Sequence, residues 1–466
     1  MIGLFRRLFA VFREYDATLG GWRFDDIKKH IDARLQSATV SEIAESHSLA
    51  LAAAAAQSGR RPRFAFVSNL PPEDTGIATC SLNTWLGYDH ALDIFSPVVD
   101  VDWFLANGAR LKAASGGRVS LYDQRVFMAV ASQQDYEAII IATGNSMHCF
   151  YIHEMLKKIE AIGATARTIL YIHDPVLLHM IQRGIPASNS QFCRSLQRIY
   201  DRTIDIADVD HLADWQLWTK LIARNIYGMR YFASLGVKGF IVNSQAARAM
   251  LERDLDGLDL FKATIFHPVF PSSAPEDMPG GAKPDGLSVG TFGVPNDSKR
   301  TREIAEAVAL LRKRGRRVRF LIAGYQANHF LGHNRDLLAH PDTEIFDGPT
   351  DRQLLRAIRT VDVAVQLRLH ALGESSGVVP MLIEAGIPTI VSGIGAFVEF
   401  GDAVHQIPAD APPAAIADAI LEAATSGPSP DAMRRYTDDH HPTLFQRRLE
   451  AIVDDWAAFR AAHGKG

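Results

Sequence analysis

The chain has 466 residues, of which 47% are hydrophobic and 22% charged, and its formal net charge is −4. This composition is ordinary for a globular protein with a sizeable core, and the charge gives no indication of nucleic-acid binding. The three cysteines, Cys80, Cys149 and Cys193, lie far apart and outside any metal-ligand spacing. We therefore expect free thiols in a reducing cytoplasm, and no apolar run approaches the roughly 20 residues needed to cross a bilayer.

Residues 1–60 are predicted to form an N-terminal helical extension. With about 100° per residue, residues 1–16 place their apolar side chains on one helix face and three arginines with Glu14 on the other. Two interpretations stay open. The helix could bind an anionic membrane surface, which would make the protein peripheral on the inner membrane face, or it could pack on its own protein.

From residue 61 onward, short apolar segments alternate with helical patterns, one of which runs from Asp214 to Leu235. This alternation predicts parallel sheets that are covered by helices on both faces. The expected strands are Phe64–Ser68, Ile139–Ala142, Thr168–Ile172, Gly239–Val242, Ser288–Phe292, Arg319–Ala323, Glu344–Phe346, Val363–Leu367 and Thr389–Ser392.

The segment 271–286 is rich in Pro, Gly and Ser and is the expected linker. We therefore predict an α/β fold with two domains, residues 61–270 and 287–440, on either side of a central cleft. Such clefts are a common place for ligand sites. Residues 441–466 are expected to end in a helix, and one alternative is that this helix crosses back to the N-terminal domain.

The most informative motif is the turn Gly373-Glu374-Ser375-Ser376-Gly377, between an expected strand and an apolar helix. Ligands of open α/β sheets bind outside the carboxyl ends of the strands. Free backbone N–H groups and the helix dipole favour a diphosphate there, and Glu374 could accept hydrogen bonds from a sugar hydroxyl. The plainer alternative is a polar turn in which Ser375 or Ser376 caps the helix.

Two further loops follow expected strands. Lys299 and Arg300 stand at the start of a helix, where two cations are unfavourable unless an anion binds; the alternative is a solvated basic turn. Thr75 and Gly76 open a helix after the first strand and could approach a phosphate or an acceptor. No GxGxxG pattern is present, which argues against a nicotinamide enzyme.

A histidine and a carboxylate end the expected strand Thr168–Ile172. We expect His173 to act on an acceptor hydroxyl or to hold a phosphate, with Asp174 orienting it. The alternative is that Asp174 caps a helix. The chain has no HExxH motif and no Cys/His cluster, so a metal site is not expected.

Together these segments resemble the retaining glycosyltransferases of the GT-B fold, of the family 4 type (glycosyl transferases group 1), in a variant with a GESSG turn. The resemblance spans about residues 63–425. It rests on RFAFVSNLPPEDTGIA, Gly144-Asn145, YIHDPVLLH, FG followed by KR, FLIAG, FDGPTDRQLL, VDVAVQLR, GESSG and GIPTIVS, in that order.

The resemblance implies two Rossmann-like domains, with the donor nucleotide held mainly by the C-terminal one, and it assigns catalytic roles to Glu374 and His173. The implied donor-phosphate residues are Lys299, Arg300, Gly76, Ser375, Ser376 and Gly377. The implied nucleotide-binding residues are Gly293, Gly324, Tyr325 and Phe346. The implied acceptor-side residues are Thr75, Asn145 and Asp174. Neither a cofactor nor a metal is expected beyond the nucleotide-diphosphate sugar, which is a co-substrate.

One departure from the family pattern concerns its two glutamates, which stand eight residues apart. Here the residue eight after Glu374 is Leu382, and the next acid is Glu384, so its role stays open. The expected function is transfer of a sugar, with retention, from a nucleotide-diphosphate sugar to a glycan or lipid-linked acceptor in polysaccharide or glycoconjugate biosynthesis. The alternatives are a non-catalytic module that binds a nucleotide-sugar or glycan, and a nucleotide-sugar epimerase.

Overall fold

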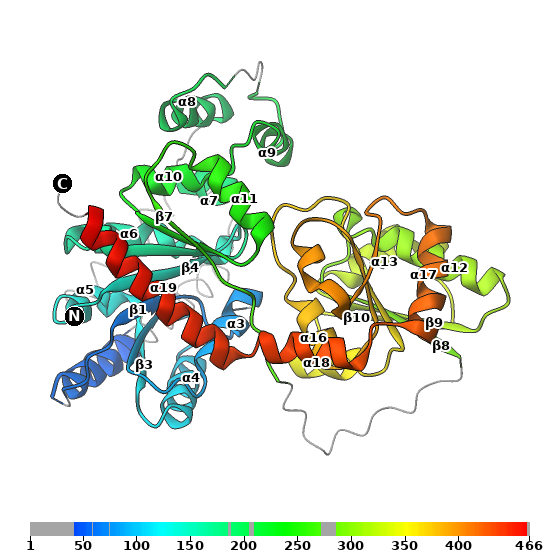
Figure 1. Ribbon diagram of the computed structural model, residues 1–466, viewed down its shortest axis with the longest axis horizontal. Coiled ribbons are helices and arrows are strands. Elements are labelled where there is room, and N and C mark those ends of the chain that lie inside the picture. Colours follow the sequence, from blue (N-terminus) through cyan, green and yellow to red (C-terminus); the bar gives the residue numbers. More distant parts are fainter. Residues whose placement is uncertain are drawn as a thin grey trace, which may run out of the picture.

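The computed structural model describes the chain in six segments: residues 42–57, 59–73, 75–184, 188–204, 209–271 and 286–463. The amphipathic pattern of residues 1–16 and nearly all of the predicted linker lie outside the described residues. The described part contains two separate sheets, each flanked by helices (Figure 1).

The N-terminal sheet has seven parallel strands in the order β3-β2-β1-β4-β5-β6-β7. Every strand except the edge strand β7 is buried along its whole length, as expected for a parallel sheet that helices cover on both faces. The strands are β1 (Phe64–Val67), β2 (Leu92–Ser96), β3 (Val119–Asp123), β4 (Ala138–Thr143), β5 (Thr168–Ile172), β6 (Gly239–Val242) and β7 (Phe261–Thr264).

The C-terminal sheet has six parallel strands in the order β10-β9-β8-β11-β12-β13. Its edge strands β10 and β13 are partly exposed, and the inner strands are almost entirely buried. The strands are β8 (Leu287–Phe292), β9 (Val318–Gly324), β10 (Thr343–Asp347), β11 (Val363–Gln366), β12 (Thr389–Ser392) and β13 (His405–Ile407).

Helices connect the strands in both halves. Those of the N-terminal half are α3 (Gly76–Trp85), α4 (Val101–Ala114), α5 (Phe127–Ala131), α6 (Tyr151–Ala161), α7 (Leu178–Gly184), α8 (Asn189–Tyr200), α9 (Asp214–Ile222), α10 (Met229–Ser234) and α11 (Gln245–Asp254). Those that follow are α12 (Thr301–Lys313), α13 (Ala327–His333), α14 (Arg335–Leu338), α15 (Asp351–Ile358), α16 (Val378–Glu384), α17 (Pro413–Ser426), α18 (Pro430–Asp439) and α19 (Pro442–His463).

Both sheets have a doubly wound order with one point at which the direction of winding reverses. This point lies between β1 and β4 in the first sheet and between β8 and β11 in the second. Ligands of doubly wound sheets bind in the crevice outside the carboxyl ends of the strands at this switch point. The loops after these four strands carry Gly76, Asn145, Lys299 and the GESSG turn, whereas His173 and Asp174 follow the neighbouring strand β5.

The last helix, α19, packs on the N-terminal half (Figure 1). The Trp456 ring is fully buried, with its centroid 5.4 Å from that of Phe261 in β7. The Gln446 amide donates to the carbonyl oxygen of Thr84 in α3 at 2.6 Å. The chain therefore passes twice between the halves, once near residue 271 and again through α18 and α19.

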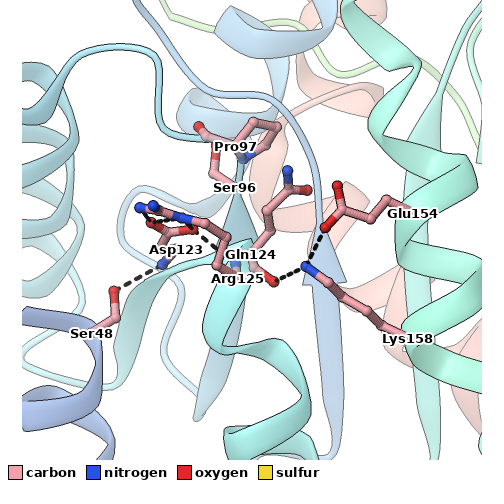
Figure 2. A network of polar contacts seen from close by, with 8 residues as sticks. All are labelled: Ser48, Ser96, Pro97, Asp123, Gln124, Arg125, Glu154 and Lys158. Atoms are coloured by element: carbon pink, nitrogen blue, oxygen red, sulfur yellow. Dashed lines mark hydrogen bonds and ion pairs between the residues drawn. The ribbon is translucent and has the colours of Figure 1, made fainter. Parts of the chain in front are cut away.

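A helix over residues 42–57 lies against the edge of the N-terminal sheet. As Figure 2 shows, the backbone N–H of Asp123 at the end of β3 donates to Ser48 Oγ of this helix at 2.9 Å. The fully buried Asp123 carboxylate pairs with the Arg125 guanidinium. The described part of the extension is thus anchored beside β3.

All strands predicted from the sequence are present, within about one residue at each end. The prediction missed β2, β3, β7 and β13. The prediction of one helix over Asp214–Leu235 was wrong in one respect, because this segment is divided into α9 and α10. The break contains Asn225 and Gly228, both with positive φ (54° and 102°), which a helix does not accommodate.

The three cysteines are buried and free. Among the described helices, none combines the length and the hydropathy that a membrane crossing requires.

Candidate functional site

Two loops meet at the switch point of the C-terminal sheet. The Leu369 N–H, in the loop after β11, donates to the Ser298 carbonyl oxygen, in the loop after β8, at 2.8 Å. A Cβ atom on Gly324, at the end of β9, would lie 2.2 Å from the Gly293 carbonyl oxygen, so only glycine permits this approach. The sequence thus brings the ends of three strands into contact.

Two cations, Lys299 and Arg368, and the Glu374 carboxylate interact electrostatically at these loops. The pKa of Lys299 is lowered to about 8, first by burial and then by the charge of Arg368, while the charge of Glu374 opposes this shift. The Arg368 guanidinium lies 4.9 Å from the centre of the Phe397 ring and donates to the Leu367 carbonyl oxygen at 2.8 Å. Burial also lowers the pKa of Arg368.

The charge of Glu374 acts on both cations, Lys299 and Arg368. Its Oε2 accepts from the Leu372 N–H at 3.0 Å, and burial raises its pKa. Two partly desolvated cations with a single carboxylate leave an excess of positive charge. Such charge is costly unless an anion compensates it, and charge-assisted hydrogen bonds to a phosphate would do so. The cluster is therefore suited to an anionic ligand.

The expectation that Arg300 binds the donor phosphates needs correction. Arg300 is only 4% exposed, and its guanidinium donates to the carbonyl oxygens of Ala409 (2.5 Å) and Ala411 (2.8 Å). Its backbone is left-handed (φ 54°). Arg368, which sequence reasoning missed, supplies the second cation. Its position directly after a predicted strand was the feature of the sequence that could have identified it.

The residues of the GESSG turn have two different roles. Ser376 is buried, and its Oγ accepts from the N–H groups of Val378 (3.3 Å) and Val379 (3.2 Å), so it caps α16. The capping alternative therefore applies to Ser376. Ser375 and Gly377 instead line the cleft.

A cavity of about 530 Å³ lies between the two halves, within the size range usual for ligand pockets. One of its walls comes from the N-terminal half and the other from α15, α16 and the GESSG turn. The lining residues are Thr75, Gly76, Ile77, Thr79, Cys80, Ser146, His148, His173, Asp174, Asn243, His267, Pro268, Phe270, Asp351, Leu354, Ser375, Gly377, Val378, Pro380 and Met381.

His173 lines this cavity as a neutral ring. Burial, with a smaller contribution from His267, lowers the pKa of His173 to about 3. Asn243 Nδ2 lies 3.3 Å from His173 Nδ1, while Nε2 is enclosed and has no hydrogen-bond partner among the described residues. A neutral imidazole can hydrogen-bond one oxygen of an acceptor hydroxyl or a phosphate, so both expected roles of His173 stay predictions.

Asp174 does not orient His173 as expected, because Asn243 contacts that ring instead. Asp174 Oδ2 accepts from the Asn145 N–H at 3.2 Å, and burial raises the pKa of Asp174. Its side chain also lines the cavity. Asp174 is therefore a half-buried carboxyl group beside the switch point of the N-terminal sheet, in the loop after the neighbouring strand β5.

Two other residues expected on the acceptor side use their side chains within the protein. Thr75 Oγ1 accepts from the Ala78 N–H at 3.1 Å and caps α3. Asn145 Oδ1 accepts from the N–H groups of His179 (3.1 Å) and Met180 (3.4 Å), at the start of α7. Their observed role is to hold the two loops in place.

The GESSG turn packs directly on the N-terminal half. Ser244 Oγ donates to the Gly373 carbonyl oxygen at 2.9 Å. Gly373 has φ 82°, and a Cβ atom there would lie 2.7 Å from Pro175 Cγ. Across this contact the charge of Asp174 raises the pKa of Glu374. The structure thus brings the two predicted carboxylates to opposite sides of one site.

The residues expected to bind the nucleotide lie at the carboxyl ends of β8, β9 and β10. Tyr325 and Phe346 are 59% and 43% exposed, beside Gly324. Exposed rings of this kind are available for stacking on a base. Within the described segments, no group of three or more His, Cys, Asp or Glu side chains is arranged to hold a metal ion.

Comparison with solved structures identifies the architecture. A glycosyltransferase from Rickettsia africae ESF-5 superposes with a TM-score of 0.56 at 11% identity, over 85% of this chain and 99% of that one. The Anabaena protein Alr3699/HepE, solved with UDP-glucose, superposes with a TM-score of 0.55 at 11% identity, over 84% of this chain and 99% of that one. An α,α-trehalose 6-phosphate synthase from Burkholderia multivorans superposes with a TM-score of 0.51 at 11% identity, over 87% of this chain and 99% of that one.

No protein-family model matches the chain, and no curated protein matches its sequence. At these identities the similarity establishes the fold: two parallel Rossmann-like sheets that match GT-B glycosyltransferase structures. The predicted fold class is therefore confirmed.

Proposed function

We propose that this chain transfers a sugar, with retention of anomeric configuration, from a nucleotide-diphosphate sugar to a hydroxyl group of a glycan or lipid-linked acceptor. The observation that carries the proposal is the cluster of Lys299, Arg368 and Glu374 at the C-terminal switch point, opposite Asp174 and His173. The Anabaena neighbour with UDP-glucose supports the ligand class.

In the proposed reaction, the bond between the sugar C1 and the diphosphate oxygen breaks, and its electron pair stays on that oxygen. The acceptor oxygen forms the new bond to C1, and its proton passes to the departing diphosphate. Lys299 and Arg368 stabilise the negative charge that develops on the leaving group, which is a large contribution in a site with little water. Glu374 would accept hydrogen bonds from the donor sugar.

The N-terminal residues have a different task in this scheme. Asp174 and the neutral His173 would position the acceptor hydroxyl, and the contact between Ser244 and Gly373 would hold the two halves closed. Positioning a hydroxyl near the reacting carbon reduces the entropic part of the barrier. Closure would also keep water away from the activated sugar.

The first test is a thermal-shift panel of UDP-, GDP- and ADP-sugars with the wild-type protein and Arg368→Gln. A ligand at 100 times its Kd stabilises the folded chain by about 2.7 kcal/mol, which is readily detected. We expect one base class to stabilise the wild type and the shift to decrease strongly in Arg368→Gln. Arg335→Gln, which changes an exposed arginine on α14, is the matched control and should behave as wild type.

The second test follows the fate of the bound donor. We expect the sugar to appear on an acceptor, with an anomeric coupling that shows retention by NMR. Binding without turnover on any acceptor would instead favour the non-catalytic module. Conversion of the donor to an epimer with no acceptor present would favour the epimerase.

A further inference from the structure

The 530 Å³ cavity has two walls of different chemistry. The wall from the N-terminal half is mainly polar and includes Thr79, Ser146 and Asp174. The opposite wall, from α15, α16 and the GESSG turn, is mainly apolar through Leu354, Val378, Pro380 and Met381, and its polar side chains are Asp351 and Ser375. A hydrogen bond from Thr79 Oγ1 to Asp351 Oδ2 (3.5 Å) joins the two walls. A ligand between them would therefore meet mainly polar groups on one side and mainly hydrocarbon on the other.

The charges of the cavity are opposite to those of the donor cluster. None of its described lining residues is Lys or Arg, and two, Asp174 and Asp351, are carboxylic acids. His148 Nδ1 pairs with Glu73 Oε2 at 2.5 Å. Burial lowers the pKa of His173 to about 3 and of His267 to about 4, so both rings are neutral. On the side of this cavity that Asp174 and Ser146 line, a phosphate would lose its water and gain no cation in return.

We propose that the part of the acceptor that enters this cavity is an uncharged glycoside with an apolar aglycone, and not a sugar phosphate. The glycoside hydroxyls would face Asp174 and Ser146, and the aglycone would pack on Leu354, Pro380 and Met381. Apolar surface removed from water on this wall contributes to binding, whereas a bare sugar cannot fill it. This inference rests on the proposed transferase function and specifies its acceptor class.

The test uses three matched acceptor sets with the wild-type protein: n-octyl glycosides of common hexoses, the unsubstituted hexoses, and their 6-phosphates. Binding is measured by calorimetry in the presence of the nucleoside diphosphate identified in the donor panel, and transfer is measured by mass spectrometry. We expect at least one octyl glycoside to bind at least tenfold more tightly than the parent hexose. We expect no saturable binding of the 6-phosphates in the same range.

Two results would overturn this inference and leave the proposed function intact. One is tighter binding of a hexose 6-phosphate than of the matching octyl glycoside. The other is a lack of saturable binding by every octyl glycoside while the nucleotide still binds. A failure of the proposed function has a different signature, because then no nucleotide or nucleotide-sugar stabilises the protein.

A substitution on the apolar wall ties the effect to this cavity. Leu354→Lys should weaken octyl glycoside binding at least tenfold while nucleotide binding changes less than twofold. Leu355→Lys is the matched control, since Leu355 is the next residue of α15, is also half-buried, and does not line the cavity. If both variants weaken glycoside binding equally, the apolar wall is not the binding surface. If Leu354→Lys does not fold, Met381→Gln tests the same wall.

Discussion

The two switch points have the same topology but opposite chemistry. At the C-terminal one, Lys299 and Arg368 share a single carboxylate, Glu374. Beside the N-terminal one lie the half-buried Asp174 and a neutral His173. The two crevices are equivalent in topology. The C-terminal one therefore presents a positive surface, and the N-terminal one opposite it presents a neutral-to-negative surface. The difference indicates that the fold supplies the position of a site and that a few side chains decide which charge it accepts.

The largest expected effect comes from removing the positive charge. Lys299→Gln combined with Arg368→Gln should weaken nucleotide-sugar affinity at least about 100-fold, because hydrogen bonds to charged groups contribute about 1.5–3 kcal/mol each. Calorimetry provides the measurement. Lys313→Gln combined with Arg335→Gln, both exposed in the same half, is the charge-matched control. Equal losses in both double variants would mean that general charge, and not this cluster, attracts the ligand.

The contact between the halves gives the next largest effect. Gly373→Ala requires positive φ at an alanine and places its Cβ against Pro175, Met250 and Ala247, with a strain of about 1–3 kcal/mol. We expect transfer to slow at least tenfold, as measured by product formation at saturating donor. Gly332→Ala, on α13 with open space around the added Cβ, should retain full activity. Unchanged transfer in Gly373→Ala would show that this packing is not needed for catalysis.

The pH dependence of donor binding should report on Lys299. Its pKa in the free protein is lowered to about 8, so its charge is present below pH 8 and is lost as the pH rises through 8. A bound diphosphate favours the protonated amine. Affinity should therefore be constant below pH 7 and fall about tenfold between pH 7 and pH 9. Lys299→Arg keeps its charge, and its profile with the same ligand should lack this fall; identical profiles would exclude Lys299 as a phosphate ligand.

The smallest effect on donor binding is expected from the N-terminal side. Asp174→Asn should change nucleotide-sugar affinity by no more than about twofold, because Asp174 faces Glu374 and not the cations. The same variant should slow transfer, because its carboxyl group lines the acceptor cavity. A loss of donor affinity as large as that in Arg368→Gln would remove the distinction between the two switch points.

Sequence reasoning missed β2 and β3, each of which contains a buried aspartate. Strand β2 includes Asp93, which is buried because Arg60 and Tyr136 pair with it. Strand β3 includes the buried Asp123, paired with Arg125. Such pairs interrupt the apolar pattern, and the partners of Asp93 lie 33 and 43 residues away along the chain.

The candidate site was predictable in its position but not in all of its residues. The strand–turn–helix pattern located Glu374 and Lys299 because carboxyl ends of parallel strands meet at one edge. It could not show that Arg300 has a left-handed backbone and donates to Ala409 and Ala411, or that Arg368 supplies the second cation. Side-chain direction depends on backbone conformation, which motif spacing does not specify.

The most direct test of the central claim is calorimetric titration of the donor sugar nucleotide into the wild type, Arg368→Gln and Arg300→Gln, with the folded fraction of each determined by circular dichroism. We predict that Arg368→Gln loses affinity at least tenfold. Arg300→Gln should lower the unfolding temperature, because two carbonyl oxygens lose their donor, while affinity per folded molecule stays within about twofold. The reverse pattern, with affinity lost in Arg300→Gln and kept in Arg368→Gln, would contradict the account.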